Sequence, residues 1–239
     1  MKTRNSNAIL AKSLIVPLLW GVLGGRATGA WLSWGSEVFS DFRDSYGNTL
    51  DGTYYIQIGF FEAALGEQFG PSRENTSEWG SRWRVFDQAS YNADIGYFTS
   101  TAKLTETGGS SSEYADLGLN FSGKEAYLWI YNDRNVATGS EWLLARAGDW
   151  IFPRSGPGCC DSALPTEWSV SDLSIETPVW GASGGNYGDG FNTVRDANYT
   201  LQTFAVVPEP ASPVFAALPA IILTLARRGR NRTTARSAR

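Results

Sequence analysis

Short apolar runs separated by Gly, Asn, Asp and Ser dominate the middle of the chain, a pattern that indicates β-strands. Residues 54–61 alternate so that Tyr54, Ile56, Ile58 and Phe60 share one face of an extended segment. The whole pattern predicts about seven strands, over residues 54–61, 96–104, 126–131, 142–145, 150–152, 170–175 and 199–206.

Two of these runs say more about the sheets. Residues 96–104 bring Phe98, Ala102 and Leu104 to one face. Residues 126–131 are apolar on both faces, so this strand is expected in the middle of a sheet that is covered on each side. The density of strands and turns favours a mainly β fold, namely a single antiparallel β-sandwich or jelly-roll-like domain.

One segment has the period of a helix instead. Asn75 is a helix-capping residue type and Glu78 follows three positions later, the spacing of a capping box. Aromatic residues continue at helical spacing, at Trp79, Trp83 and Phe86. We therefore predict one short amphipathic helix over residues 76–88, whose aromatic stripe packs against the sheet. A ligand platform is the alternative role of that stripe.

The first thirty residues follow the pattern of an export signal. Basic residues precede an apolar run at 13–25, and small residues follow at 27–30. We expect residues 1–30 to be a signal peptide that is cleaved after Gly29 or Ala30, which implies the export translocon and signal peptidase as partners. The alternative, a retained signal anchor, is disfavoured because thirteen helical residues reach only about 20 Å across a hydrocarbon core of about 30 Å.

The last 33 residues, 207–239, reverse this order. A Pro-rich start leads into an apolar span at 211–226, and an Arg-rich tail follows at 227–239. Positive charge resists translocation, so the arginines are expected to hold the tail in the cytoplasm, chiefly Arg227, Arg228, Arg230 and Arg232. The span is a poor permanent anchor, because it carries Pro213 and Pro219 and reaches about 24 Å at most.

The Pro-rich start of this tail is the motif Val207, Pro208, Glu209 and Pro210, and the apolar span and the arginine cluster follow it in order. In this order the three features resemble the PEP-CTERM sorting signal of Gram-negative bacteria. The resemblance implies passage through the inner membrane as a transiently anchored precursor, cleavage near the triplet by an exosortase-type transpeptidase, and release to the cell surface or extracellular matrix. A plain C-terminal anchor, or a Pro-rich linker that arose by chance, is the alternative. The body resembles other proteins with this tail only weakly, and that resemblance brings no activity with it.

The composition of the body, residues 31–206, disfavours some classes of partner and excludes some classes of catalytic site. It carries 23 acidic and 10 basic side chains, a formal charge of −13, which disfavours nucleic acid as a partner. The chain has no histidine, so catalytic sites that need an imidazole are excluded. About 176 residues suit one domain with a substantial core.

Cys159 and Cys160 are adjacent in the sequence. Export would expose them to an oxidising compartment. A disulfide between neighbours is strained, because their α-carbons lie about 3.8 Å apart. Three outcomes stay open: a vicinal disulfide that stiffens the loop, which we favour, links to other chains, or two free thiols.

Three ligand chemistries remain for the body. Loop tryptophans can stack on sugars, and Trp168 and Trp180 are the candidates for contact with an extracellular polysaccharide. Paired carboxylates would permit a polysaccharide hydrolase, but no strand motif of alternating acids supports it. Calcium could use the loops at 131–135 or 184–192, although neither has a known calcium signature. We therefore expect no metal site, no cofactor and no catalytic residue, and a structural or interaction role instead.

Overall fold

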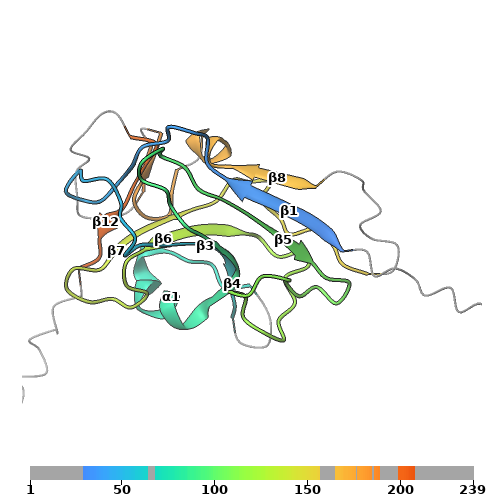
Figure 1. The fold of residues 1–239 in the computed structure, drawn as a ribbon. Coiled ribbons are helices and arrows are strands. Elements are labelled where there is room, and N and C mark those ends of the chain that lie inside the picture. The colour runs from blue at the N-terminus through green and yellow to red at the C-terminus, as the bar shows by residue number, and fades with distance from the viewer. Residues whose placement is uncertain are drawn as a thin grey trace, which may run out of the picture.

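The computed structural model describes residues 29–63, 68–156, 165–175, 177–184, 186–188 and 199–207. These residues form three sheets and one short helix, so the predicted mainly β class is confirmed and is consistent with a β-sandwich. Figure 1 shows a three-stranded sheet above a five-stranded sheet, with the helix below.

The three-stranded sheet has the order β5 (Thr99–Leu104), β1 (Ala30–Gly35) and β8 (Thr166–Ser169). Strand β1 lies in its middle, antiparallel to β5 and parallel to β8. The five-stranded sheet has the order β12 (Phe204–Ala205), β7 (Glu141–Ala145), β6 (Tyr127–Tyr131), β3 (Tyr55–Phe61) and β4 (Trp83–Ala89), with each neighbouring pair antiparallel. A third sheet of short strands has the order β10 (Asn186–Tyr187), β9 (Ala182–Ser183), β11 (Leu201–Gln202) and β2 (Phe42–Arg43).

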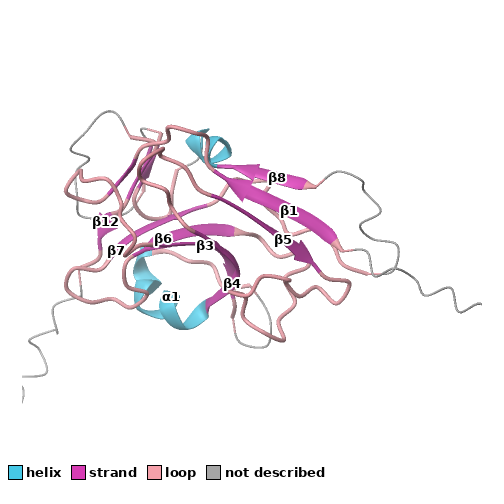
Figure 2. Ribbon diagram, viewed as in Figure 1, coloured by secondary structure: helices cyan, strands magenta, loops and turns pink. Residues whose placement is uncertain are grey.

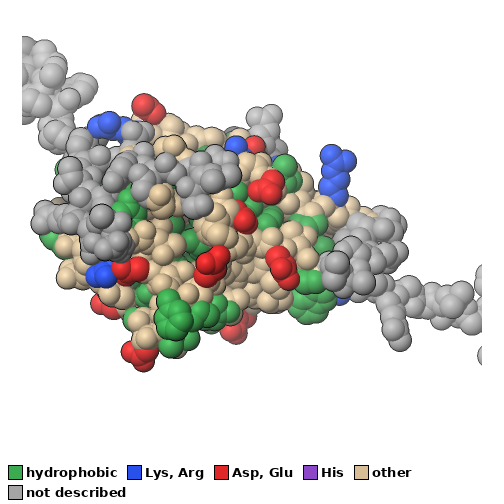
Figure 3. Space-filling model, turned by 90° about the horizontal axis from the view of Figure 1, so that it is seen from above, with side chains coloured by type: hydrophobic (Ala, Val, Ile, Leu, Met, Phe, Trp, Pro, Cys, Tyr) green, Lys and Arg blue, Asp and Glu red, His purple; other side chains and the backbone are tan. Residues whose placement is uncertain are grey.

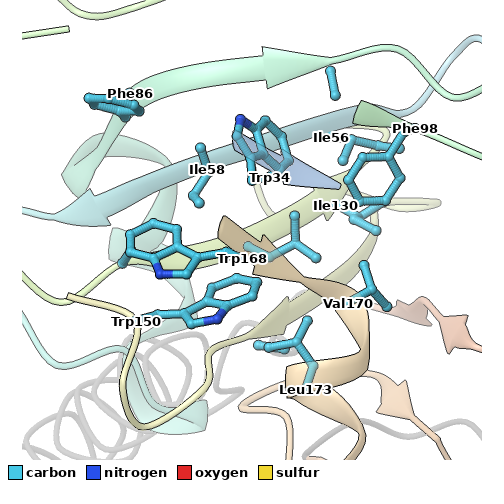
Figure 4. Packing of buried hydrophobic residues seen from close by; sticks show 14 of the residues in the cluster. Trp34, Ile56, Ile58, Phe86, Phe98, Ile130, Trp150, Trp168, Val170 and Leu173 are labelled. Atoms are coloured by element: carbon cyan, nitrogen blue, oxygen red, sulfur yellow. The ribbon is translucent and has the colours of Figure 1, made fainter. Parts of the chain in front are cut away.

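A hydrophobic cluster, here called the sandwich core, fills the space between the three-stranded and the five-stranded sheet. Strand β1 contributes Leu32 and Trp34 from above, and β3 contributes Ile56 and Ile58 from below. Trp150 and Trp168 stack within this cluster with their ring centroids 5.3 Å apart and an interplanar angle of 13° (Figure 4). The prediction that alternating residues of 54–61 face one core is confirmed, because Ile56, Ile58 and Phe60 all belong to it.

A second cluster, here called the aromatic layer, covers the other face of the five-stranded sheet. It contains five tryptophans, Trp79, Trp83, Trp129, Trp142 and Trp180. Strand β6 supplies both clusters, Leu128 and Ile130 to the sandwich core and Trp129 to the aromatic layer. The prediction that residues 126–131 form a central strand covered on both faces is therefore confirmed.

The predicted helix over residues 76–88 is correct only in its first half. Helix α1 (Thr76–Arg82) follows a turn of 3-10 helix, η2 (Arg73–Asn75), and ends where Trp83 adopts an extended conformation and begins β4 (Figure 2). Pairing with β3 decides the second half, because Trp83 then enters the aromatic layer while Phe86 enters the sandwich core on the opposite face. A helical stripe would have put both rings on one side.

Three predicted strands are also corrected. Residues 170–175 form a 3-10 helix, η3 (Val170–Ile175), and the strand there is β8, directly before it. Residues 150–152 contribute only an isolated bridge between Glu125 and Ile151. Residues 199–206 are divided into β11 and β12 at Thr203, because the two halves pair with different sheets.

Candidate functional site

The solvent side of the three-stranded sheet carries mostly polar side chains. Strand alternation points Leu32 and Trp34 into the sandwich core and leaves Trp31, Ser33 and Gly35 on the outer side. Register places their neighbours in rows across the three strands. We call this surface the polar face; its residues are Trp31, Ser33, Gly35, Thr99, Thr101, Lys103, Glu167 and Ser169.

The rows of the polar face are defined by strand pairing. The first row joins Trp31 to Lys103, and the second joins Thr101, Ser33 and Glu167. The hydroxyl oxygens of Ser33 and Thr101 lie 3.1 Å apart, within hydrogen-bond distance. The third row joins Thr99, Gly35 and Ser169. Hydroxyl groups thus occupy both sides of the central strand.

A shallow groove of about 390 Å³ lies at the third row, and Gly35 is one of its lining residues. Its lining includes Ser36, Glu167, Ser169 and Asp172. Asp172 Oδ2 accepts hydrogen bonds from the Trp150 indole at 3.1 Å and from the Ser169 backbone N–H at 2.9 Å. These two bonds hold the carboxyl group in place at the end of the groove.

A second hollow has a volume of about 260 Å³. Its lining includes Glu37, Val170 and Ser171, which are sequence neighbours of residues that line the first groove. Phe39 lines it as well, with φ of 67°, the one non-glycine residue with positive φ among the described residues. Its side chain is 85% exposed, and Val38 beside it is also exposed. Two exposed apolar side chains therefore lie at this hollow, among lining residues that are mostly polar.

Two carboxyl groups lie inside the protein and are used by its own donors. Glu141 accepts hydrogen bonds from Ser45, Tyr54 and Thr203. Asp87 accepts from the Trp34 indole at 2.8 Å and from the Ser112 hydroxyl at 2.6 Å. Burial, and next the charge of Glu141, raise the pKa of the Tyr54 hydroxyl well above its ordinary value of 10, so that Tyr54 stays a donor to this carboxylate.

The tryptophans predicted as ligand contacts are both buried. Trp168 belongs to β8 rather than to a loop, and its ring is 6% exposed and stacks on Trp150. Trp180 is 3% exposed, pairs with Leu144 through an isolated bridge, and donates its indole N–H to the Phe204 carbonyl at 3.2 Å. Trp168 does line the groove, so its contact with a ligand stays a prediction.

Trp31 was not among the tryptophans predicted from the sequence to contact a ligand. It is 53% exposed, whereas each of the other described tryptophans is at most 6% exposed. The alternation of residues 30–35 contains the signal, because Leu32 and Trp34 occupy one face of the strand and Trp31 occupies the other.

Several predicted site residues lie outside the described residues. These are Cys159 and Cys160, the Pro208, Glu209 and Pro210 triplet, and the arginines Arg227, Arg228, Arg230 and Arg232. Val207, the last described residue, is 54% exposed. At the other end, Gly29 is buried and Ala30 already pairs with Leu104 in the sheet.

Two properties of the described part of the chain concern metals and membranes. Within the described ranges, no group of three or more Cys, Asp or Glu side chains is placed to hold a metal ion. In the loop at 131–135, the Asp133 carboxylate accepts the Asn135 backbone N–H at 2.9 Å, an ordinary turn. Most of the loop at 184–192 lies outside the described residues. None of the helices in the described ranges has the length and apolar character needed to cross a bilayer.

No protein-family profile, no curated protein and no solved structure matches the chain.

Proposed function

We propose that this chain is an exported bacterial protein of the cell surface or extracellular matrix, processed at both ends, with a structural or interaction role for its body. The observation that carries the proposal is the order of features along the chain. An apolar leader comes first, the acidic body follows, and the Pro-Glu-Pro triplet, apolar span and arginine cluster stand at the end. An exosortase-type transpeptidase would cut near Pro208–Pro210 while the arginines hold the tail in the inner membrane.

The geometry of the body's last residues supports this reading. The Val206 backbone N–H donates to the Ser140 carbonyl at 2.7 Å, and Val207 directly after it is exposed. The triplet therefore follows immediately on a residue that faces solvent. Pro208 and Pro210 oppose regular structure around Glu209, which favours an extended segment that an enzyme can bind.

The mass of the intact protein tests the proposal. The protein is recovered separately from the inner membrane, outer surface and medium of its producing cells. We expect a form that begins at Ala30 or Trp31, ends near Pro208–Pro210, and is found on or beyond the outer surface. A protein that still ends at Arg239 and stays in the inner membrane, in cells with an active exosortase, would contradict sorting.

A pair of variants separates the triplet from the rest of the tail. Replacement of Pro208, Glu209 and Pro210 together by Ala should leave the precursor uncut and in the membrane. Pro213→Ala is the matched control, because it removes a proline from the same tail outside the triplet. Equal processing of both variants would show that the triplet is not what the enzyme recognises.

A further inference from the structure

We propose that the polar face binds a neutral polysaccharide, with Trp31 as the ring on which a sugar stacks. The inference rests on the proposed function only in that an exported body meets polysaccharides outside the cell. It assigns the ligand to the outer side of the β5–β1–β8 sheet rather than to the buried Trp168 and Trp180.

The exposure of Trp31 is the first observation. Burial is the usual state of tryptophan in this body, since the other eight described tryptophans all lie within the two clusters. Trp31 instead lies half exposed on the solvent side of the sheet, beside Ser33 along the strand and Lys103 across it. A large flat ring open to solvent suits the apolar face of a pyranose, which stacks on aromatic rings.

The spacing of polar groups is the second observation. Neighbouring strands lie about 4.8 Å apart, so the hydroxyls of Thr101 and Ser33 and the carboxylate of Glu167 form a short line across the sheet. The next line, Thr99 and Ser169, flanks the groove over Gly35. Trp31 and Gly35 are about 13 Å apart along the strand, which is long enough for more than one sugar ring.

The charge of the surface decides which polymer fits. The polar face carries one cationic side chain, Lys103, and one anionic side chain, Glu167, and Asp172 adds a carboxylate to the groove. The proposed cleavage after Gly29 or Ala30 would add the α-amino group of the mature chain at or next to Trp31. Figure 3, which views this side from above, shows mainly uncharged polar surface with scattered acidic groups and few basic ones. Such a surface offers hydroxyl and carboxylate partners to sugar hydroxyls, and the formal charge of −13 on the body as a whole repels a polyanion.

Binding is tested with the protein purified in the form that its cells release or retain. It is mixed with suspensions of cellulose, chitin and curdlan, with the extracellular polysaccharide of the producing cells, and with alginate as the polyanion. The fraction of protein depleted from solution gives the affinity. The variant is Trp31→Ala, and Tyr46→Ala is the matched control because it removes an exposed aromatic side chain that lies outside the polar face.

We expect retention on at least one neutral polymer and not on alginate. Trp31→Ala should weaken binding by about tenfold, equivalent to about 1.4 kcal/mol, while Tyr46→Ala binds as the parent does. A soluble fragment of the retained polymer should change the tryptophan fluorescence of the parent, and Trp31→Phe should abolish that change. Far-ultraviolet circular dichroism of Trp31→Ala confirms that the variant is folded.

Three results would overturn the inference. The first is that the protein is retained on no neutral polymer, including that of the cells. The second is that Trp31→Ala binds as well as the parent does. The third is that Trp31→Ala differs from the parent only in how strongly the protein associates with itself. The last would assign the face to contacts between copies of the chain. Localisation is a separate readout. If the protein binds polysaccharide but still ends at Arg239 and stays in the inner membrane, the binding site is supported and the proposed sorting is contradicted.

Discussion

The fold buries several polar side chains together with their hydrogen-bond partners, among them Glu141, Asp87 and Gln57. Gln57 lies within the aromatic layer, where its Oε1 accepts from the Trp83 indole at 2.9 Å and from the Tyr131 hydroxyl at 2.8 Å. Its amide Nε2 donates to the Gln88 side chain at 2.8 Å. A buried polar group with satisfied hydrogen bonds is tolerated, but the loss of its partner is costly.

Glu141 gives the strongest test of this point. Its Oε2 accepts from the Ser45 backbone N–H at 2.9 Å, the Tyr54 hydroxyl at 3.0 Å and the Thr203 hydroxyl at 2.7 Å, and its Oε1 accepts from the Ser45 hydroxyl at 2.5 Å. Glu141→Ala leaves these donors without an acceptor, so we expect the free energy of unfolding to fall by about 3 kcal/mol or more. Urea unfolding measures it.

Glu78→Ala is the matched control for this prediction. Glu78 forms an ion pair with Arg82 on the exposed side of α1, at 3.0 Å. Exposed pairs contribute roughly 0–1 kcal/mol, so this variant should be close to the parent. Equal losses in the two variants would show that the buried hydrogen bonds of Glu141 contribute no special stability. Glu141→Gln, which keeps the shape of the side chain, should lie between them.

At the scale of elements, the junction between α1 and β4 shows local and long-range preferences in conflict. The helix is short and contains Gly80, which lowers helix propensity by about 1 kcal/mol relative to Ala. From Trp83 onward, pairing with β3 satisfies the backbone and places the side chains in two separate clusters. The strand is therefore favoured over a longer helix because it buries aromatic rings on both faces of the sheet.

The pairing of β3 with β4 depends on the small size of Gly59. The register shifts between Ile58 and Gly59, where Ile58 pairs with Asp87 and Gly59 with Val85, so that Phe86 is the extra residue of a β-bulge. A Cβ at position 59 would collide with the Arg84 carbonyl oxygen. We expect Gly59→Ala to destabilise the protein by about 1–3 kcal/mol, because the two strands must move apart.

The control for Gly59 is Gly70→Ala, because a Cβ at position 70 meets no atom within 4 Å. That variant should change stability by at most about 0.5 kcal/mol. Both are compared by thermal unfolding followed by near-ultraviolet circular dichroism, which reports the packing of the aromatic rings. A Gly59→Ala protein as stable as Gly70→Ala would show that the bulge accommodates a side chain.

At the scale of the whole molecule, the arrangement of two clusters around one sheet leaves several tyrosine hydroxyls inside. Burial raises the pKa of Tyr131 to about 12, and burial together with the nearby Glu125 raises that of Tyr127 to about 12. Burial and Glu141 raise the pKa of Tyr54 further. In the folded protein all three hydroxyls are protonated. Tyr54 and Tyr131 donate hydrogen bonds, and the ring of Tyr127 packs in the aromatic layer.

These raised pKa values predict a loss of stability in alkali. In the unfolded chain tyrosine ionises near pH 10, whereas the folded protein resists ionisation until about pH 12. The contribution is therefore complete below about pH 10 and is lost as the pH rises toward about 12. Urea midpoints measured across this interval should fall steadily. Tyr131→Phe should be less stable at neutral pH but show a smaller fall, and a midpoint constant up to about pH 12 would contradict the prediction.

Features that depend on neighbours along the chain could be predicted from the order of residues alone. Alternation identified the strands at residues 54–61 and 126–131 and the double-sided burial of the second, because side-chain direction in a strand follows directly from position. The order of apolar and charged segments at the two ends, on which the proposed export depends, is likewise a property of the chain alone.

The contacts between side chains that are distant in the sequence became evident only in the folded chain. Trp168 and Trp180 were predicted to contact a ligand because they were expected in loops, yet both are buried by contacts with residues distant in the sequence. Glu141 is buried among partners far away in the sequence, Tyr54 and Thr203. The helix ends at Arg82 because the next residues pair with β3, which is also distant in the sequence. The local pattern can indicate that a strand is covered, but the elements that cover it are set by long-range contacts.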